Sequence, residues 1–146
     1  MRQSVWSMKY KYKVGCSIDN LKGVREFIRT SLQNHGISEL EISEMVLALD
    51  EMCSNLMIHA HECNPDELFE LHINVDKKDP VVFEIIDKGK VFDINQFSEP
   101  SLNNIVHEKR KGGLGIRLVK SIMDNVEYKL SDGKSICRLT KKVHYQ

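Results

Sequence analysis

The stretch that decides the fold runs from Asp50 to His59 and reads DEMCSNLMIH. Glu51, Asn55 and His59 stand four residues apart, so a helix here places a carboxylate, a carboxamide and an imidazole on one slowly drifting stripe beside its apolar face. An asparagine in the middle of a helix has poor helix propensity, and its side-chain oxygen is a good ligand for a Mg²⁺ ion that is otherwise held by phosphate oxygens and water. The alternative interpretation is an exposed helix flank on which Glu51 is solvated.

The flanking residues give this helix a start and an end. Ser38–Glu41 reads SELE, which is the pattern of a capping box at a helix N-terminus. The pair Asn64–Pro65 breaks the helical pattern, so the predicted helix ends before it. Between these points apolar residues recur every three or four positions, which predicts a core face of Ile42, Met45, Val46, Leu49, Met52, Cys53 and Leu56.

The rest of the chain alternates between strand and helix patterns. Residues 8–18 alternate apolar and polar side chains and predict a half-buried edge strand. A first helix follows, capped by Asp19 or Asn20 and ended by Gly36. The remaining predicted elements are strands at 68–75 and 81–86, a loop at 93–111, a helix over 114–123, and a final hairpin at 126–130 and 135–143. This order predicts an α+β fold, a two-layer sandwich with helices on one face of a mostly antiparallel mixed sheet, in a single domain spanning residues 1–146.

Composition limits the kinds of partner and environment. The 146 residues carry 21 basic and 21 acidic side chains, so no net field draws the chain toward nucleic acid or an anionic membrane. No run of about 18 apolar residues could span a bilayer, and the N-terminus lacks a secretory signal, so we expect a cytoplasmic protein. The four cysteines form no C-x-x-C pair and no zinc-ligand spacing, so we expect reduced structural thiols.

Two further clusters point to a ligand. Asp87 follows an apolar strand and precedes Gly89. A carboxylate there can accept a hydrogen bond from an exocyclic amine, while the glycine lets a flat ring approach the backbone. The alternative is an ordinary Asp-x-Gly turn. Gly112–Gly115 reads GGLG and opens an apolar helix, whose free N–H groups and positive dipole end suit an anion such as a triphosphate. The alternative there is a flexible hinge.

The order and spacing of the three clusters resemble a known nucleotide site. Ala48–Ala60 resembles the N-box of the superfamily of gyrase, heat-shock chaperone, histidine kinase and mismatch-repair ATPases. Asp87–Gly89 resembles its adenine-binding G1 box, and Gly113–Gly115 resembles its G2 box. Within this superfamily of histidine kinase-like ATPases, which share the Bergerat-type fold, Gly113–Asp124 and Asp132–Leu139 are most similar to the small anti-sigma factor serine/threonine kinases of bacterial partner switching.

The resemblance implies a set of nucleotide contacts. Asn55 would coordinate Mg²⁺ bound to ATP, Asp87 would hydrogen-bond the adenine amino group, and Gly89 would shape the base pocket. Thr140 on the last strand is a further candidate for contact with the adenine. His59 would lie on the phosphate side, and the glycine-rich segment that cradles the phosphates would consist of Gly112, Gly113, Leu114 and Gly115.

The resemblance also implies an activity. Glu51 stands where the family has its catalytic carboxylate, which would take the proton from a substrate Ser or Thr hydroxyl. The leading hypothesis is an ATP-dependent serine/threonine protein kinase that phosphorylates an anti-anti-sigma protein, otherwise sequesters a sigma factor or analogous regulator, and forms a homodimer. The alternative is a non-catalytic module that binds nucleotide, or only protein, and captures a regulator. Val91 favours this alternative, because the G1 box usually has a second glycine at that position.

Overall fold

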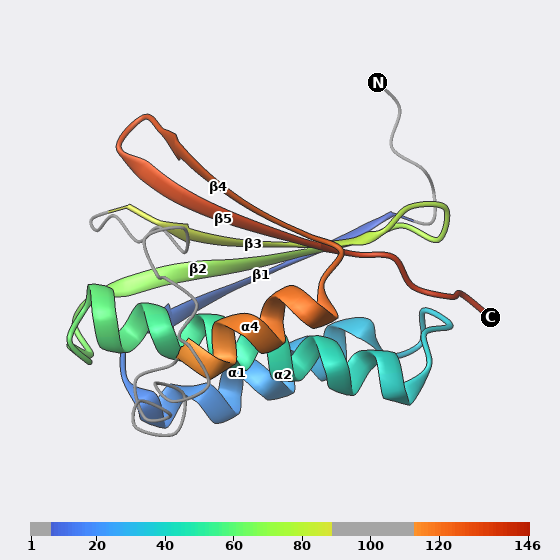
Figure 1. Ribbon diagram of the computed structural model, residues 1–146, viewed down its shortest axis with the longest axis horizontal. Helices are drawn as coiled ribbons and strands as arrows, with labels where there is room; N and C mark the ends of the chain where they lie inside the picture. The colour runs from blue at the N-terminus through green and yellow to red at the C-terminus, as the bar shows by residue number, and fades with distance from the viewer. Residues whose placement is uncertain (1–6, 89–112) are drawn as a thin grey trace.

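A sheet forms one layer of the molecule and helices form the other (Figure 1), in a computed structural model that describes residues 7–88 and 113–146. The strands are β1 (Met8–Gly15), β2 (Leu68–Val75), β3 (Val81–Asp87), β4 (Asn125–Ser131) and β5 (Lys134–Lys141). They follow the order β1-β2-β3-β5-β4, and each neighbouring pair is antiparallel. The α-helices of this part of the chain are α1 (Leu21–Leu32), α2 (Glu39–Asn55) and α4 (Gly113–Ile122).

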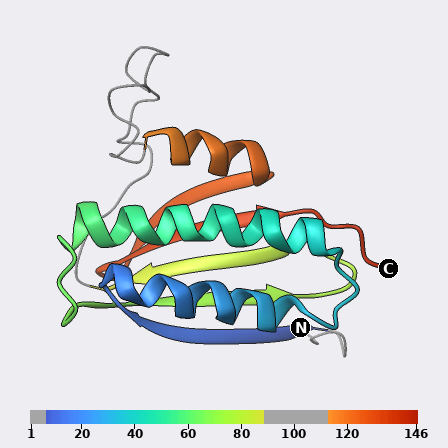
Figure 2. The ribbon, with the colours of Figure 1, turned by 90° about the horizontal axis from the view of Figure 1, so that it is seen from below.

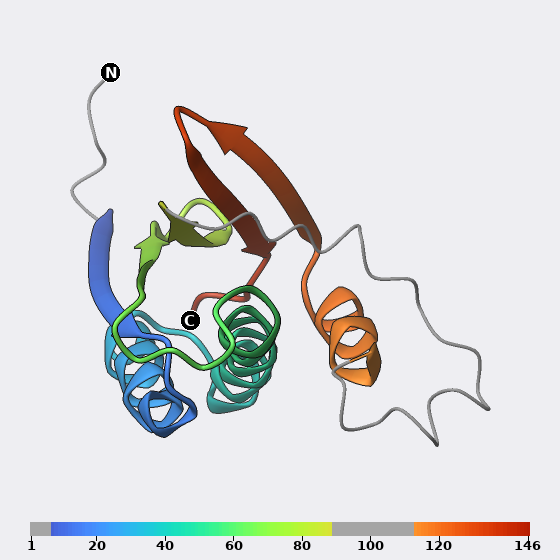
Figure 3. The ribbon, with the colours of Figure 1, turned by 90° about the vertical axis from the view of Figure 1, so that its left-hand side faces the viewer.

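All three helices cover the same face of the sheet (Figure 3). Seen from below, α2 lies between α1 and α4 (Figure 2). The predicted α+β sandwich with helices on one face is confirmed, and among the described strands every pairing is antiparallel. Within residues 7–88 and 113–146, no helix combines the length and apolar character that crossing a bilayer requires.

The core lies between the two layers. Every second residue of β2 and β3 is buried, which is the period that a strand with one covered face requires. The prediction of an edge strand at the N-terminus is confirmed, because β1 pairs only with β2 among the described strands. The largest fully buried side chains are Phe69, Phe83, Ile28, Leu32, Ile42, Met45, Leu49, Met52, Met57, Leu71 and Ile73.

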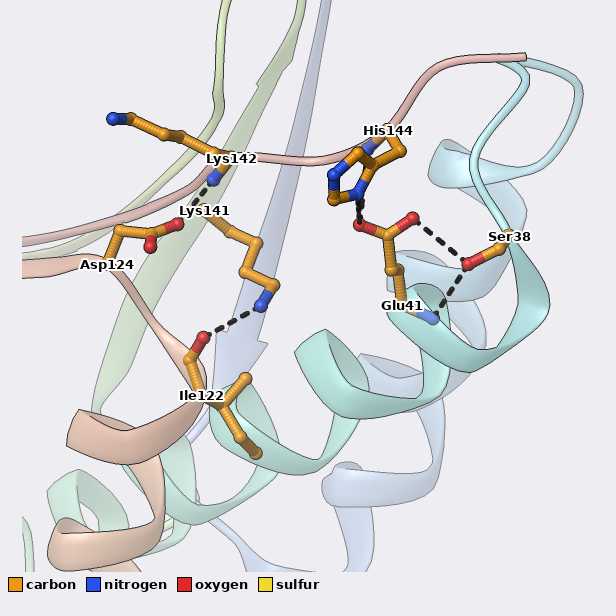
Figure 4. Close-up of polar contacts among 7 residues, drawn as sticks. All are labelled: Ser38, Glu41, Ile122, Asp124, Lys141, Lys142 and His144. Carbon is orange, nitrogen blue, oxygen red and sulfur yellow. Dashed lines mark hydrogen bonds and ion pairs between the residues drawn. The ribbon is translucent and has the colours of Figure 1, made fainter.

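The start of α2 is the predicted cap. The Ser38 hydroxyl accepts a hydrogen bond from the Glu41 N–H at 3.2 Å and donates to Glu41 Oε1 at 3.0 Å. The same carboxylate then accepts from the His144 N–H at 3.2 Å, through its other oxygen (Figure 4). Glu41 therefore joins the N-terminus of α2 to the C-terminal segment.

A second pair of contacts secures this segment where it leaves β5 (Figure 4). Lys141 Nζ donates to the carbonyl of Ile122 at 2.9 Å, and the Lys142 N–H donates to Asp124 Oδ2 at 2.6 Å. Because Ile122 is the last residue of α4, these bonds fix the C-terminal end of that helix against the end of β5.

The boundaries of α1 differ from the prediction. Asn20 occupies the predicted N-cap position of α1 but makes no side-chain cap hydrogen bond, whereas Ser17 caps a short 3₁₀ turn (Ile18–Asn20) that leads into α1. The Asn20 side chain instead donates to the Gly15 carbonyl at 2.9 Å. The helix ends at Leu32, four residues before the predicted stop.

The end of α2 also differs from the prediction of a regular helix up to Asn64. It ends at Asn55, and Leu56–Ala60 form a π-helical turn. In such a turn each hydrogen bond spans five residues, so the side chains that follow are rotated away from their α-helical directions. Glu62 and Cys63 then adopt positive φ angles of 50° and 58°.

His61, which follows the π turn, is buried, whereas His59 within the turn is not. His59 is exposed, whereas only 4% of His61 is exposed. The polar stripe predicted from the four-residue spacing therefore continues from Glu51 to Asn55 but does not extend to His59.

The Glu41 contacts predict how stability depends on pH. Burial alone would raise the pKa of Glu41, but the hydrogen bonds from Ser38 and His144 lower it below its ordinary value of 4.5. A carboxylate whose pKa is lowered on folding stabilises the native state above its unfolded pKa, and this contribution is lost as the pH falls through the folded value. Glu41→Gln should therefore flatten the fall in unfolding free energy below pH 4.5, measured by denaturant titration. Glu39→Gln, an exposed change in the same helical turn, should leave the slope unchanged, and equal slopes in wild type and Glu41→Gln would contradict the assignment.

Candidate functional site

A small pocket lies between α2 and the sheet. It encloses a cavity of about 10 Å³, enough for one water molecule. Strands β3 and β5 form the sheet side of this pocket, because Asp87 lies opposite Ser135 and Ile85 lies opposite Cys137 in their pairing. A purine is larger than this cavity, so a base could enter only with movement of flexible side chains such as Met52. The lining residues are Met52, Leu56, Ile85, Asp87, Ser135 and Cys137.

Asp87 supplies the charged group of this pocket. It is the last residue of β3 and is only 2% exposed, so its carboxylate is buried, while Gly89 of the alternative Asp-x-Gly turn lies outside the described residues. Its backbone carbonyl accepts a hydrogen bond from the Ser135 hydroxyl at 3.5 Å. Its Oδ2 lies 2.5 Å from Nε2 of His61, a residue that the sequence patterns did not select. A carboxylate beside apolar walls suits a flat ring that carries a hydrogen-bond donor.

Asn55 is buried at the end of α2. Only 2% of the residue is exposed, and its Nδ2 has no hydrogen-bond partner among the residues that the structure describes. An unpaired buried amide costs free energy, and native proteins retain such groups chiefly where a ligand or water satisfies them. The interpretation of this position as a solvated helix flank is therefore wrong.

The donor set around Asn55 limits the kind of metal site. The described residues contain no group of three or more His, Cys, Asp or Glu side chains that could hold a metal ion. A carboxamide is a suitable ligand for Mg²⁺ when most of the other ligands are phosphate oxygens and water. The side-chain oxygen of Asn55 could therefore be a ligand of a Mg²⁺ ion that arrives with a phosphorylated ligand, while the unpaired Nδ2 is a donor that suits a phosphate oxygen.

Glu51 lies one helical turn before Asn55 and is half-buried. Burial, and to a smaller extent the charge of Asp50, raises the pKa of its carboxyl group. The carboxylate presses against Gly115, where a Cβ atom would overlap Glu51 Oε2. The structure thus brings the two residues together across the α2–α4 contact, and glycine leaves room for the carboxylate in this rotamer.

The other candidates fall outside this group. Gly89 and Gly112 lie outside the described residues, while Gly113 and Leu114 open α4. His59 is exposed and does not line the pocket. Thr140 pairs with Val82, five residues along β5 from Ser135, which places it about 17 Å from the Asp87 end of the sheet.

Sequence reasoning missed Ser135 and Cys137 because their place depends on the register of β3 with β5. It missed His61 because the regular helical spacing does not reveal the π turn. The Ser131–Lys134 turn predicts a tight hairpin and so places Ser135 at the start of its second strand. The sequence does not show that β3 is the neighbouring strand.

A larger hollow on the outer face of the sheet is a weaker candidate. Its walls come from β1, β2, β3 and β5 and consist mainly of charged or polar side chains, two of which, Glu84 and Arg138, pair with each other at 3.0 Å. It offers neither an apolar slot nor an orphaned polar group of a fully buried residue, so the pocket beside Asp87 is the better candidate.

The Glu51–Gly115 contact makes a prediction about stability. Gly115→Ala should be less favourable in wild type than in a Glu51→Ala background, because the new methyl group must displace the Glu51 carboxylate from its present rotamer. In a Glu51→Ala background the same change should be neutral or stabilising, since alanine is a better helix former than glycine by roughly 0.5–1 kcal/mol. Urea unfolding of the four proteins measures this coupling. An equal cost in both backgrounds would show that the two residues do not touch.

Comparisons with known proteins agree with this geometry. The chain matches the family model described as the histidine kinase-like ATPase domain over residues 16–141. Serine-protein kinase RsbW of Halalkalibacterium halodurans is 31% identical over 98 residues, which are 64% of this chain and 58% of the relative. The anti-sigma F factor of Caldanaerobacter subterraneus is 29% identical over 105 residues, which are 70% of this chain and 71% of the relative. The chain thus spans less than two thirds of the first relative.

Solved structures show the same architecture. The RsbU and RsbW domains of a Mycobacterium tuberculosis protein superpose with a TM-score of 0.63 at 14% identity, over 93% of this chain and 32% of that one. The resemblance to serine-protein kinases and anti-sigma factors expected from the motifs is confirmed by the two relatives. Since the family match includes α2, the Asp87 pocket and the first turn of α4, the chain belongs to the histidine kinase-like ATPase domain family.

Proposed function

We propose that the protein is an ATP-dependent serine/threonine protein kinase of the anti-sigma type. The observation that carries the proposal is the placement of Glu51: its half-buried carboxylate, with a raised pKa, lies one turn before the orphaned amide of Asn55 and against the first turn of α4. A general base needs a raised proton affinity and a position beside the transferred group. The relatives named as serine-protein kinases support the same activity.

In this proposal each part of the site has one task. Asp87 accepts a hydrogen bond from the adenine amino group, and the apolar walls around it hold the ring. Asn55 is a ligand of Mg²⁺, which neutralises phosphate charge when it is bound. The N–H groups of the first turn of α4, over Gly113–Gly115, hold phosphate oxygens. Glu51 takes the proton from the hydroxyl of a substrate Ser or Thr as that oxygen attacks phosphorus.

The proposed partners follow from the named relatives. The substrate is an anti-anti-sigma protein, and when the kinase is not engaged with that partner it sequesters a sigma factor or analogous regulator. The anti-sigma name of one relative supports this part of the proposal. We further propose a homodimer that forms through β1 and α1.

Nucleotide binding is the first test. Isothermal titration with Mg²⁺ and ATP should give saturable binding, and Asn55→Ala and Asp87→Ala should each weaken it at least about tenfold, because each loses a hydrogen bond or ligand that involves a charged group. Asn74→Ala on the outer face of the sheet is the matched control and should bind like wild type. If the folded wild-type protein does not bind Mg²⁺-ATP, the kinase proposal is wrong and the alternative, a non-catalytic module that captures a regulator, is favoured.

The pH dependence of phosphoryl transfer tests Glu51. A general base acts only when it is ionised, so transfer to the partner protein should be lost as the pH falls. Because the pKa of Glu51 is raised, the midpoint of this loss should lie above 4.5, the ordinary value for glutamate. Asp50→Asn removes one cause of the shift and should move this midpoint to lower pH. Glu51→Gln should reduce transfer by about 10²–10⁴-fold while ATP still binds. Unchanged transfer in Glu51→Gln would remove this residue from the mechanism.

A further inference from the structure

His61 lies between two carboxylates at the back of the Asp87 pocket. Its Nε2 is 2.5 Å from Asp87 Oδ2, and its Nδ1 is hydrogen-bonded to Glu67 Oε2. The side chains of His61 and Asp87 are each only 2% exposed, whereas that of Glu67 is 32% exposed. His61 itself does not line the pocket, so it reaches Asp87 from the protein side.

The hydrogen-bond inventory fixes the number of protons in this group. An ionised carboxylate only accepts hydrogen bonds, and a neutral imidazole has one donor and one acceptor nitrogen. Two carboxylates can both be satisfied by one ring only if each ring nitrogen carries a hydrogen. With a hydrogen on each nitrogen, the ring donates to both carboxylates, and Asp87 accepts this hydrogen bond as a carboxylate.

The backbone on either side of His61 positions its ring between the two carboxylates. The π turn directs His61 inward, and the positive φ angles of Glu62 and Cys63 reverse the chain directly after it. Glu67 is anchored just before β2, where its carbonyl accepts the Cys16 N–H at 2.9 Å. Burial, followed by the charges of Asp87 and Glu67, raises the pKa of the nearby Cys16 thiol to about 12, so the thiol stays neutral.

An ionised, fixed Asp87 discriminates between purines. At the position where adenine presents an amino donor, guanine presents the O6 acceptor. A carboxylate attracts the first and repels the second, whereas a protonated or rotated carboxyl group loses this contrast. We propose that His61, held by Glu67, is a positioning residue that keeps the Asp87 carboxylate ionised and oriented toward the pocket, and thereby sets the preference for ATP over GTP. This inference rests on the proposed function.

The nucleotide experiment compares affinities for Mg²⁺-ATP and Mg²⁺-GTP by isothermal titration. His61→Phe keeps a ring but removes both donors, and it should lower ATP affinity about tenfold, the effect of one hydrogen bond to a charged group, while GTP affinity is unchanged or higher. His61→Gln retains a donor for Asp87 and should recover most of the ATP preference. The matched control is His72→Phe, a partly buried histidine of β2 that pairs with Glu70 at 3.7 Å and lines the hollow on the outer face. If the role of His61 is merely structural, His61→Phe and His72→Phe should both lower the free energy of unfolding, and neither should change the ratio of ATP affinity to GTP affinity.

Glu67→Gln provides a second variant that the fold tolerates, because this side chain is partly exposed. It should reduce the ATP/GTP ratio in the same direction by a smaller factor. Wild-type ratios in folded His61→Phe and Glu67→Gln would overturn the proposal.

An independent measurement separates this inference from the kinase proposal. Nitrogen-15 chemical shifts of the His61 ring in the protein without nucleotide should show a hydrogen on both nitrogens at neutral pH, and Asp87→Asn should remove one. His144, whose side chain is 96% exposed, provides the reference ring. If wild type binds neither nucleotide, the kinase proposal and the ATP preference both fail, whereas nucleotide binding with unchanged ratios in the variants overturns only the role of His61. A singly protonated His61 ring that does not respond to Asp87→Asn overturns the pairing of His61 with Asp87.

Discussion

The packing of α2 onto the antiparallel sheet is the constraint on which the site depends. The apolar face of this helix, including Met45, Leu49 and Met52, is buried against the inner face of the strands. Each such side chain contributes about 1.5–3 kcal/mol when it is fully removed from water. This burial fixes the rotation of α2 about its axis, and the rotation in turn decides that Asn55 points inward and that Glu51 lies at the border with α4. The polar residues are placed by their apolar neighbours.

The second contact that shapes the site joins α2 to α4. A helix normally keeps its neighbour at 8–10 Å because side chains fill the space between them. At Gly115 the absence of a side chain lets the Glu51 carboxylate reach the first turn of α4. The same backbone segment carries the free N–H groups that suit an anion. One glycine therefore connects the candidate base with the candidate phosphate site, and the bonds of the C-terminal segment to Ile122 and Asp124 hold the far end of the helix.

Three partly or fully buried polar side chains among the described residues fall into two kinds. Glu41 and Asp87 have their hydrogen-bond needs met by specific partners, Ser38 and His144 in one case and His61 in the other. The Nδ2 of Asn55, by contrast, has no hydrogen-bond partner among the described residues. A group that is left unsatisfied in the core lowers stability, and proteins keep such groups at sites where a ligand completes them. The contrast between these residues therefore separates the scaffold of the site from the part that is proposed to contact the ligand.

Much of the fold was readable from the chain itself. The alternation of residues 8–18, the strand patterns of 68–75 and 81–86, the Ser38 cap and the apolar stripe of α2 act locally, so each predicts its element without knowledge of the partner. The same holds for Glu51, Asn55, Asp87 and Gly115, whose residue types and spacing resemble a known site. Sequence patterns did not predict the helix end at Asn55, because a π turn has the same composition as an α turn and forms in response to tertiary packing.

Tertiary structure alone decided which residues meet. Ser135 and Cys137 reached the pocket because β5 inserts between β3 and β4, a pairing that joins residues far apart in the chain. The π turn buried His61 and exposed His59, the reverse of what four-residue spacing predicts. The sequence by itself determined the elements and the residue types of the site, since these follow from local periodicity and motif. The register of distant strands and the close approach of helices determined the geometry, because they depend on the burial of surfaces that no local segment contains.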